Sequence, residues 1–305
     1  MTRATDWRTI AERGSIIGMR FIVWCYRLFG RGLCQLLLVP IIAYFFVTHP
    51  VARAASRQYL HRLHHHPGHG SPFVREPGLW HSLLHFREFG LNILDRVGFL
   101  LGRNAEVKLV VHGVEHLEGL MRQRRGAVLL SAHLGSFDVL RVLADRAGVV
   151  VKVVMFLRNA RMINAIFRDL NPQLATQIIN IEPGSPRAVF EMRDCIQRGE
   201  FVGLLGDRVG AGDARVEHVS FLEQPAAFPQ GPFALTTLLR CPLLFIIGLR
   251  VDRTAYEIFI EPLDGADTHE TMRRYVARLE AYCRRAPYQW FNFFDFWAGH
   301  LTASA

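Results

Sequence analysis

From residue 107 onward, short apolar runs rich in β-branched residues alternate with segments of helical periodicity. The runs have the length of strands and are bounded by polar or turn-forming residues. The predicted strands are Val107–Val111, Ala127–Ser131, Val149–Phe156, Gln177–Ile181, Phe201–Leu205, Pro242–Leu249 and Tyr256–Ile260. Strands of this kind, joined through helices, form a parallel sheet that is covered on both faces. We therefore expect an α/β fold with a mostly parallel central sheet.

Several of the intervening segments carry helix-boundary signals. Ser136 is a good N-cap residue for a helix with an apolar face, and Ser185-Pro186 precedes a second helix that ends near Gly199. Asp267 with Glu270 has the pattern of a capping box for a last helix. An amphipathic helix is also expected from Leu79 to Leu100.

The N-terminal part of the chain is strongly apolar from Ile16 to Val47. Arg20, Arg27 and Arg31 recur at helical spacing, which predicts an amphipathic helix with one basic face at a membrane interface. The remaining uncharged stretch is short for a membrane span and contains Pro40. We expect a monotopic anchor or shallow hairpin. One transmembrane pass and a buried core helix are the alternatives.

A histidine-rich segment follows the apolar region. It contains His61, His64, His65, His66 and His69, among proline and glycine residues typical of a hinge. Such a density of imidazoles would suit a metal. Because no carboxylate is close by in the sequence, the segment is expected to be a solvated loop without a metal; a histidine-loop metalloprotein is the alternative.

The net charge of +9 and the pI of about 9.8 predict attraction to anionic partners. No recognition helix, zinc finger or RNA-binding pattern is present, so no nucleic acid partner is expected. An anionic membrane surface or an acidic carrier protein fits better. The five cysteines form no C-x-x-C pair, which favours buried free thiols in a reducing compartment.

A histidine lies in the glycine turn between the second predicted strand and the helix that starts near Ser136. The segment reads Ser-Ala-His-Leu-Gly-Ser-Phe-Asp, with His133 and Asp138 five positions apart. We expect Asp138 to accept the Nδ1–H of His133, which leaves Nε2 to take a proton from a substrate hydroxyl. An isolated pair of this spacing is more often structural, so the surrounding motifs decide between the two interpretations.

Those motifs resemble the bacterial lipid A late acyltransferases, the lauroyl and myristoyl enzymes within the lysophospholipid acyltransferase superfamily. The resemblance extends from about Leu79 to Trp297. It rests on the His-Leu-Gly-Ser-Phe-Asp segment and on collinear matches at His112–Leu117, Met155–Arg158, Gly206–Arg208, Phe221–Pro232 and Pro287–Trp290.

Three departures from the family pattern bear on the acceptor. Phe228-Pro229-Gln230-Gly231 lacks the glutamate and arginine with which the glycerol-phosphate branch binds its substrate, so a glycerolipid acceptor is disfavoured. Asp207-Arg208 stands where the lipid A branch often has two aspartates. The aromatic C-terminal run Trp290–Trp297 replaces an arginine-rich ending. It resembles the variant associated with aryl-polyene and fatty-acid-like gene clusters. We expect the run to complete the core; the alternative is that it forms the floor of an acyl-chain groove.

The resemblance implies an acyltransferase. It would move a fatty acyl chain from an acyl carrier protein or acyl-CoA thioester to a hydroxyl or amine of a lipid or glycolipid, with no cofactor. His133 would be the general base and Asp138 its support. Arg158 and Arg208 would hold anionic oxygens, Asp207 would order its loop, and the backbone N–H groups near Gly231 would stabilise the oxyanion.

The expected domains are a membrane-associating helical anchor over residues 1–63, a hinge over 64–78 and the acyltransferase domain over 79–305. The expected location is the cytoplasmic face of the cell inner membrane. The alternative is a catalytically inactive membrane protein of the same fold that binds lipid or carrier protein.

Overall fold

The computed structural model describes residues 16–66, 70–155, 177–182, 185–209 and 215–298. The chain divides into two compact units. Unit 1 contains residues 1–98, 218–227 and 276–305, and unit 2 contains residues 99–217 and 228–275. The expected division into anchor, hinge and enzyme domain describes functional segments and stays a prediction.

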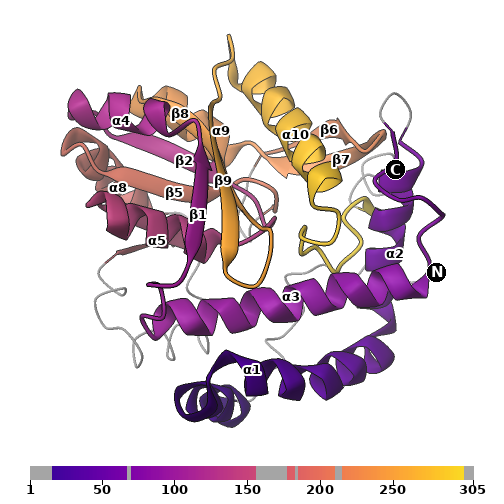
Figure 1. The fold of residues 1–305 in the computed structure, drawn as a ribbon. Helices are drawn as coiled ribbons and strands as arrows, with labels where there is room; N and C mark the ends of the chain where they lie inside the picture. Colours follow the sequence, from indigo (N-terminus) through magenta and orange to yellow (C-terminus); the bar gives the residue numbers. More distant parts are fainter. Residues whose placement is uncertain (1–15, 67–69, 156–176, 183–184, 210–214, 299–305) are drawn as a thin grey trace. The chain divides into compact units, whose positions relative to one another are not determined.

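A seven-stranded sheet forms the centre of unit 2 (Figure 1). The strands lie in the order β1-β9-β8-β2-β5-β3-β4, and neighbouring strands are parallel except β8 and β9, which form an antiparallel pair. Their bounds are β1 Lys108–His112, β2 Ala127–Ser131, β3 Val151–Met155, β4 Ile178–Asn180, β5 Phe201–Leu205, β8 Leu243–Arg250 and β9 Ala255–Pro262. The predicted α/β fold with a mostly parallel sheet is confirmed.

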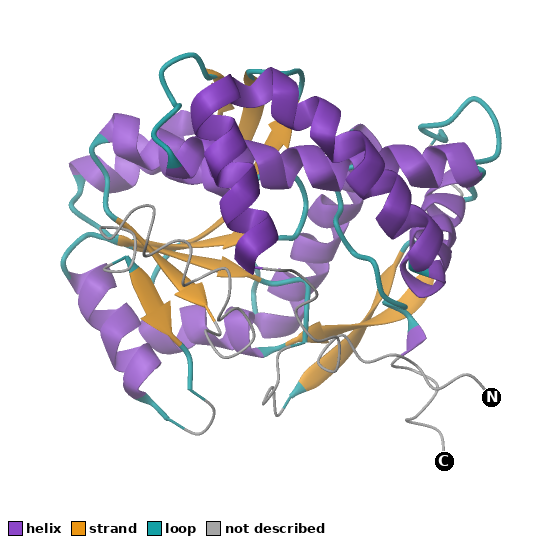
Figure 2. Ribbon diagram, turned by 90° about the horizontal axis from the view of Figure 1, so that it is seen from below, coloured by secondary structure: helices purple, strands orange, loops and turns teal. Residues whose placement is uncertain are grey.

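The central strands β2, β5 and β8 are buried on both faces of the sheet, with helices on either side (Figure 2). On one face, Leu129 and Ile246 pack with Val139 and Leu140 of the helix that follows β2. On the other face, the ring of Tyr275 contacts three phenylalanine rings, those of Phe228, Phe233 and Phe245. Continuous burial on both faces explains why β2 and β5 show no polar alternation and, apart from Ser131 at the end of β2, contain no polar residue.

The helices of unit 2 connect and cover these strands. They are α4 Val114–Arg122, α5 Phe137–Ala147, α8 Arg187–Gln197, α9 Gly231–Leu239 and the first part of α10 Thr268–Arg285. At the start of α10, the backbone N–H of Glu270 donates to Oδ1 of Asp267 over 2.7 Å, as the capping pattern predicted. The sequence analysis does not predict the two short helices α4 and α9. It also does not predict the two-stranded ribbon formed by β6 (Val216–Phe221) and β7 (Gln224–Pro229).

Unit 1 has an aromatic core to which the C-terminal run contributes. Trp290, Phe296 and Trp297 are buried, and their rings contact one another and the ring of Phe221. Tyr59 of α2 (Pro50–His64) lies against Trp290. The expectation that this run completes the core is confirmed. None of the five cysteines of the chain forms a disulfide.

Helix α1 (Ile16–Thr48) runs antiparallel to α3 (Leu79–Leu100), as Figure 1 shows. Tyr26 lies over Gly98, and Leu38 and Ile42 lie over Gly90. A Cβ at Gly98 would stand 2.5 Å from the Tyr26 hydroxyl oxygen, and one at Gly90 would stand 3.1 Å from both Leu38 and Ile42. The two glycines therefore let the helices approach closely.

The predicted basic face of α1 is corrected by the structure at Arg31. Gly30 has φ +71°, which breaks the helical register between Arg27 and Arg31. The Arg31 guanidinium binds Oδ1 of Asp95 on α3 through Nε at 2.9 Å and through one terminal nitrogen at 2.6 Å. Both side chains are largely buried, so Arg31 joins two helices instead of facing a membrane surface.

The outward side of α1 remains apolar. Trp24, Leu36 and Val47 expose more than half of their surface, and Phe21, Leu28, Phe29, Val39 and Tyr44 do so as well. The stretch Arg20–Thr48 is long and apolar enough to cross a membrane by length and composition, and little of it is buried within the protein. An exposed apolar surface of this extent indicates membrane association.

The Arg31–Asp95 pair generates a stability prediction. Asp95→Ala leaves a guanidinium without its carboxylate in a largely buried position, and we expect a loss of about 3–5 kcal/mol in the free energy of unfolding. The control is Asp194→Ala, because the Arg193–Asp194 pair is about half exposed on both sides and is expected to contribute less than about 1 kcal/mol. Denaturant unfolding in detergent measures both. Equal losses in the two variants would contradict the role assigned to the buried pair.

Candidate functional site

Two side chains meet where strands β2 and β5 end. These strands are parallel neighbours, and Ser131, the last residue of β2, pairs in register with Leu205, the last residue of β5. His133 and Asp207 each lie two residues beyond these strand ends. Because parallel strands end at the same edge of a sheet, the register brings these two residues together although they are far apart in the sequence.

Asp207 contacts His133 through both carboxylate oxygens. Oδ1 lies 2.8 Å from Nδ1 of the ring, and Oδ2 accepts the backbone N–H of His133 over 3.0 Å. The Asp207 side chain is fully buried, whereas the His133 side chain is 29% exposed. A carboxylate at Nδ1 selects the tautomer with the proton on Nδ1, so that the lone pair of the neutral ring lies on Nε2. This geometry can serve a general base.

The charge of Asp207 is stabilised despite its burial. Burial alone raises the pKa of this carboxyl, but the attraction of His133, its hydrogen bonds and the nearby Arg208 charge lower the pKa to about 2. Asp207 is therefore a carboxylate throughout the neutral range. Its contribution to stability is present above the ordinary pKa of 3.8 and is lost as the pH falls through about 2.

A glycine turn connects His133 to α5. Gly135 has φ +68°, and a Cβ there would stand 2.1 Å from the carbonyl oxygen of Gly248 in β8. That carbonyl accepts the N–H of Ser136, the N-cap of α5, over 2.7 Å. Gly248 in turn has no room for a side chain, because a Cβ would stand 2.4 Å from Val139. The turn that carries His133 is thus held against the backbone of the sheet.

The structure corrects the partner predicted for His133. Asp138 lies in the first turn of α5 as expected and is buried, with Arg141 at 3.9 Å. The position at Nδ1, however, is taken by Asp207, for which the resemblance predicts only a role in ordering its loop. The sequence signal for this role was the Gly-Asp-Arg triplet directly after a fully apolar strand.

Of the other three predicted site residues, the structure describes Arg208 and Gly231 but not Arg158. Arg208 follows Asp207 directly; burial lowers the pKa of its guanidinium, and the charge of Asp207 opposes that shift. Gly231 is exposed at the first position of α9. Arg158 lies outside the described residues.

Tyr275 connects α9 to the end of β2. Its hydroxyl donates to the carbonyl of Ser131 over 2.9 Å, and its ring lies 5.3 Å from that of Phe233 in the first turn of α9. The N-terminus of α9, where Gly231 lies, is therefore packed through one aromatic residue onto the strand that leads to His133.

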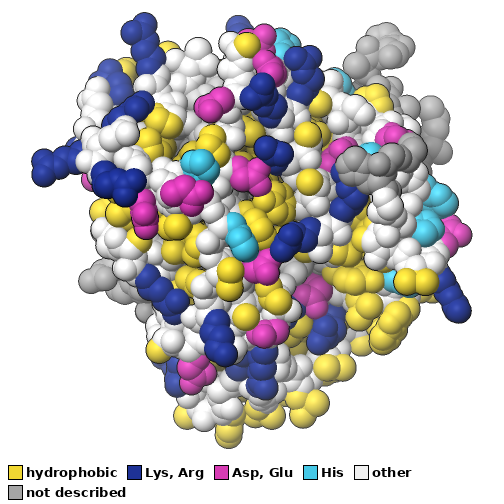
Figure 3. Space-filling view, turned by 45° about the horizontal axis from the view of Figure 1, so that its top comes forward, with side chains coloured by type: hydrophobic (Ala, Val, Ile, Leu, Met, Phe, Trp, Pro, Cys, Tyr) yellow, Lys and Arg dark blue, Asp and Glu magenta, His cyan; other side chains and the backbone are white. Residues whose placement is uncertain are grey.

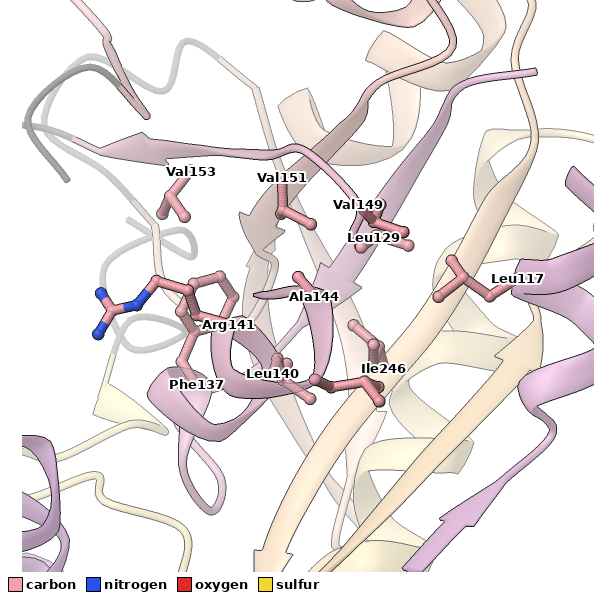
Figure 4. A pocket seen from close by; sticks show the side chains of 11 residues that line it. Leu117, Leu129, Phe137, Leu140, Arg141, Ala144, Val149, Val151, Val153 and Ile246 are labelled. Atoms are coloured by element: carbon pink, nitrogen blue, oxygen red, sulfur yellow. The ribbon is translucent and has the colours of Figure 1, made fainter. Parts of the chain in front are cut away.

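An apolar cavity of about 30 Å³ lies under α5 (Figure 4). Apart from Arg141, its lining is aliphatic and aromatic, with Leu129, Phe137, Leu140 and Ile246 among the residues. Ligand pockets for small molecules usually measure about 300–1,000 Å³, so this void is a packing defect and no acyl-chain site.

Basic side chains are spread over the face of the molecule in Figure 3, among acidic and apolar ones, without a single large patch. Among the described residues, the only group of three or more metal-ligating side chains close to one another consists of His61, His65 and Glu76, in unit 1.

A second histidine, His85 of α3, is fully buried in unit 1. Its Nε2 lies 2.8 Å from the carbonyl oxygen of Trp290, and its Nδ1 lies 3.0 Å from Oγ of Ser56. Ser82 donates to Ser56 over 2.8 Å. A neutral ring with the proton on Nε2 satisfies every contact in this chain. His85 thus has the bonded partners that a catalytic histidine needs, but both ring nitrogens are occupied within the core.

The burial of His85 predicts that the free energy of unfolding depends on pH. Burial lowers the pKa of His85 from 6.5 to about 4, although the bond to Trp290 opposes the shift. Between these two values the unfolded chain binds more protons than the folded one, so stability is lost as the pH falls from 6.5 toward 4.

We expect His85→Phe to flatten the slope of unfolding free energy against pH in this window, whatever its effect on absolute stability. The control is His218→Ala, which removes an exposed imidazole without opening the core and should keep the parental slope. Denaturant unfolding at a series of pH values measures this. A parental slope in His85→Phe would show that other groups cause the acid sensitivity.

Comparison with known proteins agrees with this geometry. A search of curated proteins found no match. The family model described as bacterial lipid A biosynthesis acyltransferase matches residues 90–298, which include every strand of the sheet, His133 and Asp207. Because the match covers more than half of the chain, the protein belongs to the bacterial lipid A biosynthesis acyltransferase family.

Proposed function

We propose that this acyltransferase moves a fatty acyl chain from an acyl carrier protein or acyl-CoA thioester to a hydroxyl or amine of a lipid or glycolipid, with His133 as general base. The observation that carries the proposal is the His133–Asp207 pair at the ends of two parallel strands. A partly exposed imidazole whose Nδ1 faces a buried carboxylate has the arrangement that general-base catalysis requires.

In the proposed reaction, Nε2 of His133 takes the proton from the acceptor hydroxyl as the acceptor oxygen attacks the thioester carbonyl. A C–O bond forms, and the C–S bond breaks when the tetrahedral intermediate collapses. The imidazolium then gives its proton to the leaving thiolate. Asp207 stays ionised throughout and stabilises the imidazolium, consistent with its pKa of about 2. No covalent acyl-enzyme is needed.

The remaining predicted residues have supporting roles in this proposal. Arg208 and Arg158 bind anionic oxygens of the acceptor or of phosphopantetheine. The N-terminal N–H groups of α9, beginning at Gly231, stabilise the oxyanion. Asp138 supports the segment that carries His133 from the first turn of α5, without occupying Nδ1 of the ring.

The assigned roles predict distinct kinetic effects. His133→Ala removes the base and should lower the rate of transfer by about 10²–10⁴. Asp207→Asn should lower kcat by at least about tenfold with little change in KM, because the ring loses the carboxylate that holds its tautomer and stabilises its charge. The measurement follows radiolabel from acyl carrier protein, or from acyl-CoA, into a total bacterial lipid extract, using detergent-purified protein.

Two further variants complete this experiment. His269→Ala also removes a histidine that contacts a carboxylate, Glu217, and should leave transfer unchanged. Asp138→Asn should cost less than Asp207→Asn. Transfer by His133→Ala above a tenth of the parental rate would remove the general-base role. A folded parental protein that transfers no label from either donor to any lipid would favour a catalytically inactive binding protein.

We further propose that α1 lies along the cytoplasmic face of the inner membrane and does not cross it. The antiparallel contacts with α3 extend from Tyr26 and Gly98 to Phe46 and Phe86. α3 carries Arg87, Glu88 and Arg96, with Arg87 exposed. A membrane-spanning α1 would draw these side chains into hydrocarbon, where an Arg at the centre costs at least about 2.5–3.5 kcal/mol.

This orientation predicts that both ends of α1 stay on the cytoplasmic side. A cysteine introduced at Arg20 or at Thr48, both exposed, should react with a membrane-impermeant maleimide only after spheroplasts are permeabilised. The parent protein, with its five native thiols, gives the background. Labelling of either position in intact spheroplasts would contradict this orientation, and labelling of one but not the other would show that α1 crosses the membrane.

A further inference from the structure

Three side chains with metal-binding atoms meet at the end of α2. His61 lies in its last turn, and His65 follows four residues later, where its backbone N–H donates to the carbonyl of His61 over 3.0 Å. This spacing puts the two imidazoles on one face, with ring centroids 4.2 Å apart. Glu76 approaches them from the segment that leads into α3.

The carboxylate of Glu76 contacts both rings through one oxygen. Oε1 lies 3.0 Å from Nε2 of His61 and 3.9 Å from Nε2 of His65. The potential ligand atoms of the three residues all lie within 4.8 Å of one another. A tetrahedral zinc ion with bonds of about 2.0–2.1 Å separates its ligand atoms by about 3.3 Å, so small side-chain movements complete the set.

We propose that His61, His65 and Glu76 bind one Zn²⁺ ion through Nε2 of each histidine and the Glu76 carboxylate. Two imidazoles and one carboxylate are a ligand set that zinc accepts, with water in the remaining position. Each of the three side chains is more than half exposed, so the ion has direct access from solvent. The fold supplies the carboxylate that the histidine-rich sequence lacks locally, and this contact is the reason for proposing a metal where the sequence alone favours a solvated loop.

The bound ion would join the end of α2 to the segment before α3. It would thereby close the connection between two helices of unit 1 and favour the folded state, because the unfolded chain does not hold these ligands together. The simpler alternative is an ordinary hydrogen bond between His61 and Glu76. The structure contains such a pair elsewhere, where Nδ1 of His269 lies 2.5 Å from Oε1 of Glu217.

The test uses full-length protein in detergent, purified without a polyhistidine tag and stripped of metal with a chelator. Zinc titration against a chromophoric competitor should show that each protein chain binds one zinc ion tightly, which we call the tight equivalent. His61→Ala, His65→Ala and Glu76→Gln should each weaken that equivalent by at least about tenfold. Cobalt in place of zinc should give the visible absorption of a four-coordinate site, and zinc should raise the Tm of the parent but of none of these three variants.

Two matched variants distinguish this site from unspecific binding to histidines. His64→Ala removes a neighbouring ring whose Nδ1 is bonded to Ser71 over 2.6 Å, and His269→Ala removes the contact between His269 and Glu217. Both should keep the tight equivalent and the zinc-dependent rise in Tm. The proposal is overturned if the parent binds zinc no better than His65→Ala, or if His64→Ala loses as much affinity as His61→Ala. None of these readouts depends on acyl transfer.

Discussion

The register between β2 and β5 is the constraint on which the site depends. Ser131 pairs with Leu205, so the two parallel strands end side by side. His133 and Asp207 each follow two residues after these ends and therefore lie in contact. A shift of one residue in either strand would move the carboxylate away from Nδ1 and would also reverse the inward and outward side chains of a fully buried strand. The apolar core therefore specifies the geometry of the polar pair. The carbonyl of Ser131 is further held by the Tyr275 hydroxyl, and the turn after His133 is held by the backbone of Gly248.

A fully buried carboxylate is unfavourable unless its charge is compensated. Asp207 receives a hydrogen bond from the backbone of His133, contacts the ring through its other oxygen and lies next to the charge of Arg208. These interactions outweigh burial and keep the group ionised. The same contacts limit the rotation of the His133 ring, so one set of interactions provides both the negative charge and the orientation. Arg31 and Asp95 show the same principle in unit 1, where a largely buried pair holds α1 to α3.

Local patterns predicted the parts of the molecule that depend on local physics. The bounds of Ala127–Ser131 and Phe201–Leu205 were predicted correctly because both are short, mostly apolar runs, the first ending in a serine and the second followed by Gly206 and Asp207. His133 follows from the same local pattern, as a polar residue in the glycine turn shortly after the strand. Its partner was assigned to Asp138 because that carboxylate is near in sequence, whereas Asp207 reaches the ring only through strand pairing. The contact of Glu76 with His61 was not predicted, because it joins two separate segments of the chain. Arg31 was placed on the wrong face because the helix breaks at Gly30 and because its partner, Asp95, lies on another helix.

His85 and His133 both have hydrogen-bonded ring nitrogens, but their partners and their burial differ. These differences determine how easily each ring can gain and lose a proton. In His85 both ring nitrogens have partners within a fully buried chain of hydrogen bonds, and a lowered pKa keeps the ring neutral. Accepting a proton there would disrupt the bond from Ser56 and place a charge in an apolar core. In His133 the Nδ1 contact is with a carboxylate that favours the protonated ring, and the side chain reaches the surface of its unit. A general base must gain and lose a proton in each cycle without disturbing the fold. That exchange costs less in the environment of His133 than in that of His85, which is why we propose that the chemistry takes place at the end of β2 and not in the core of unit 1.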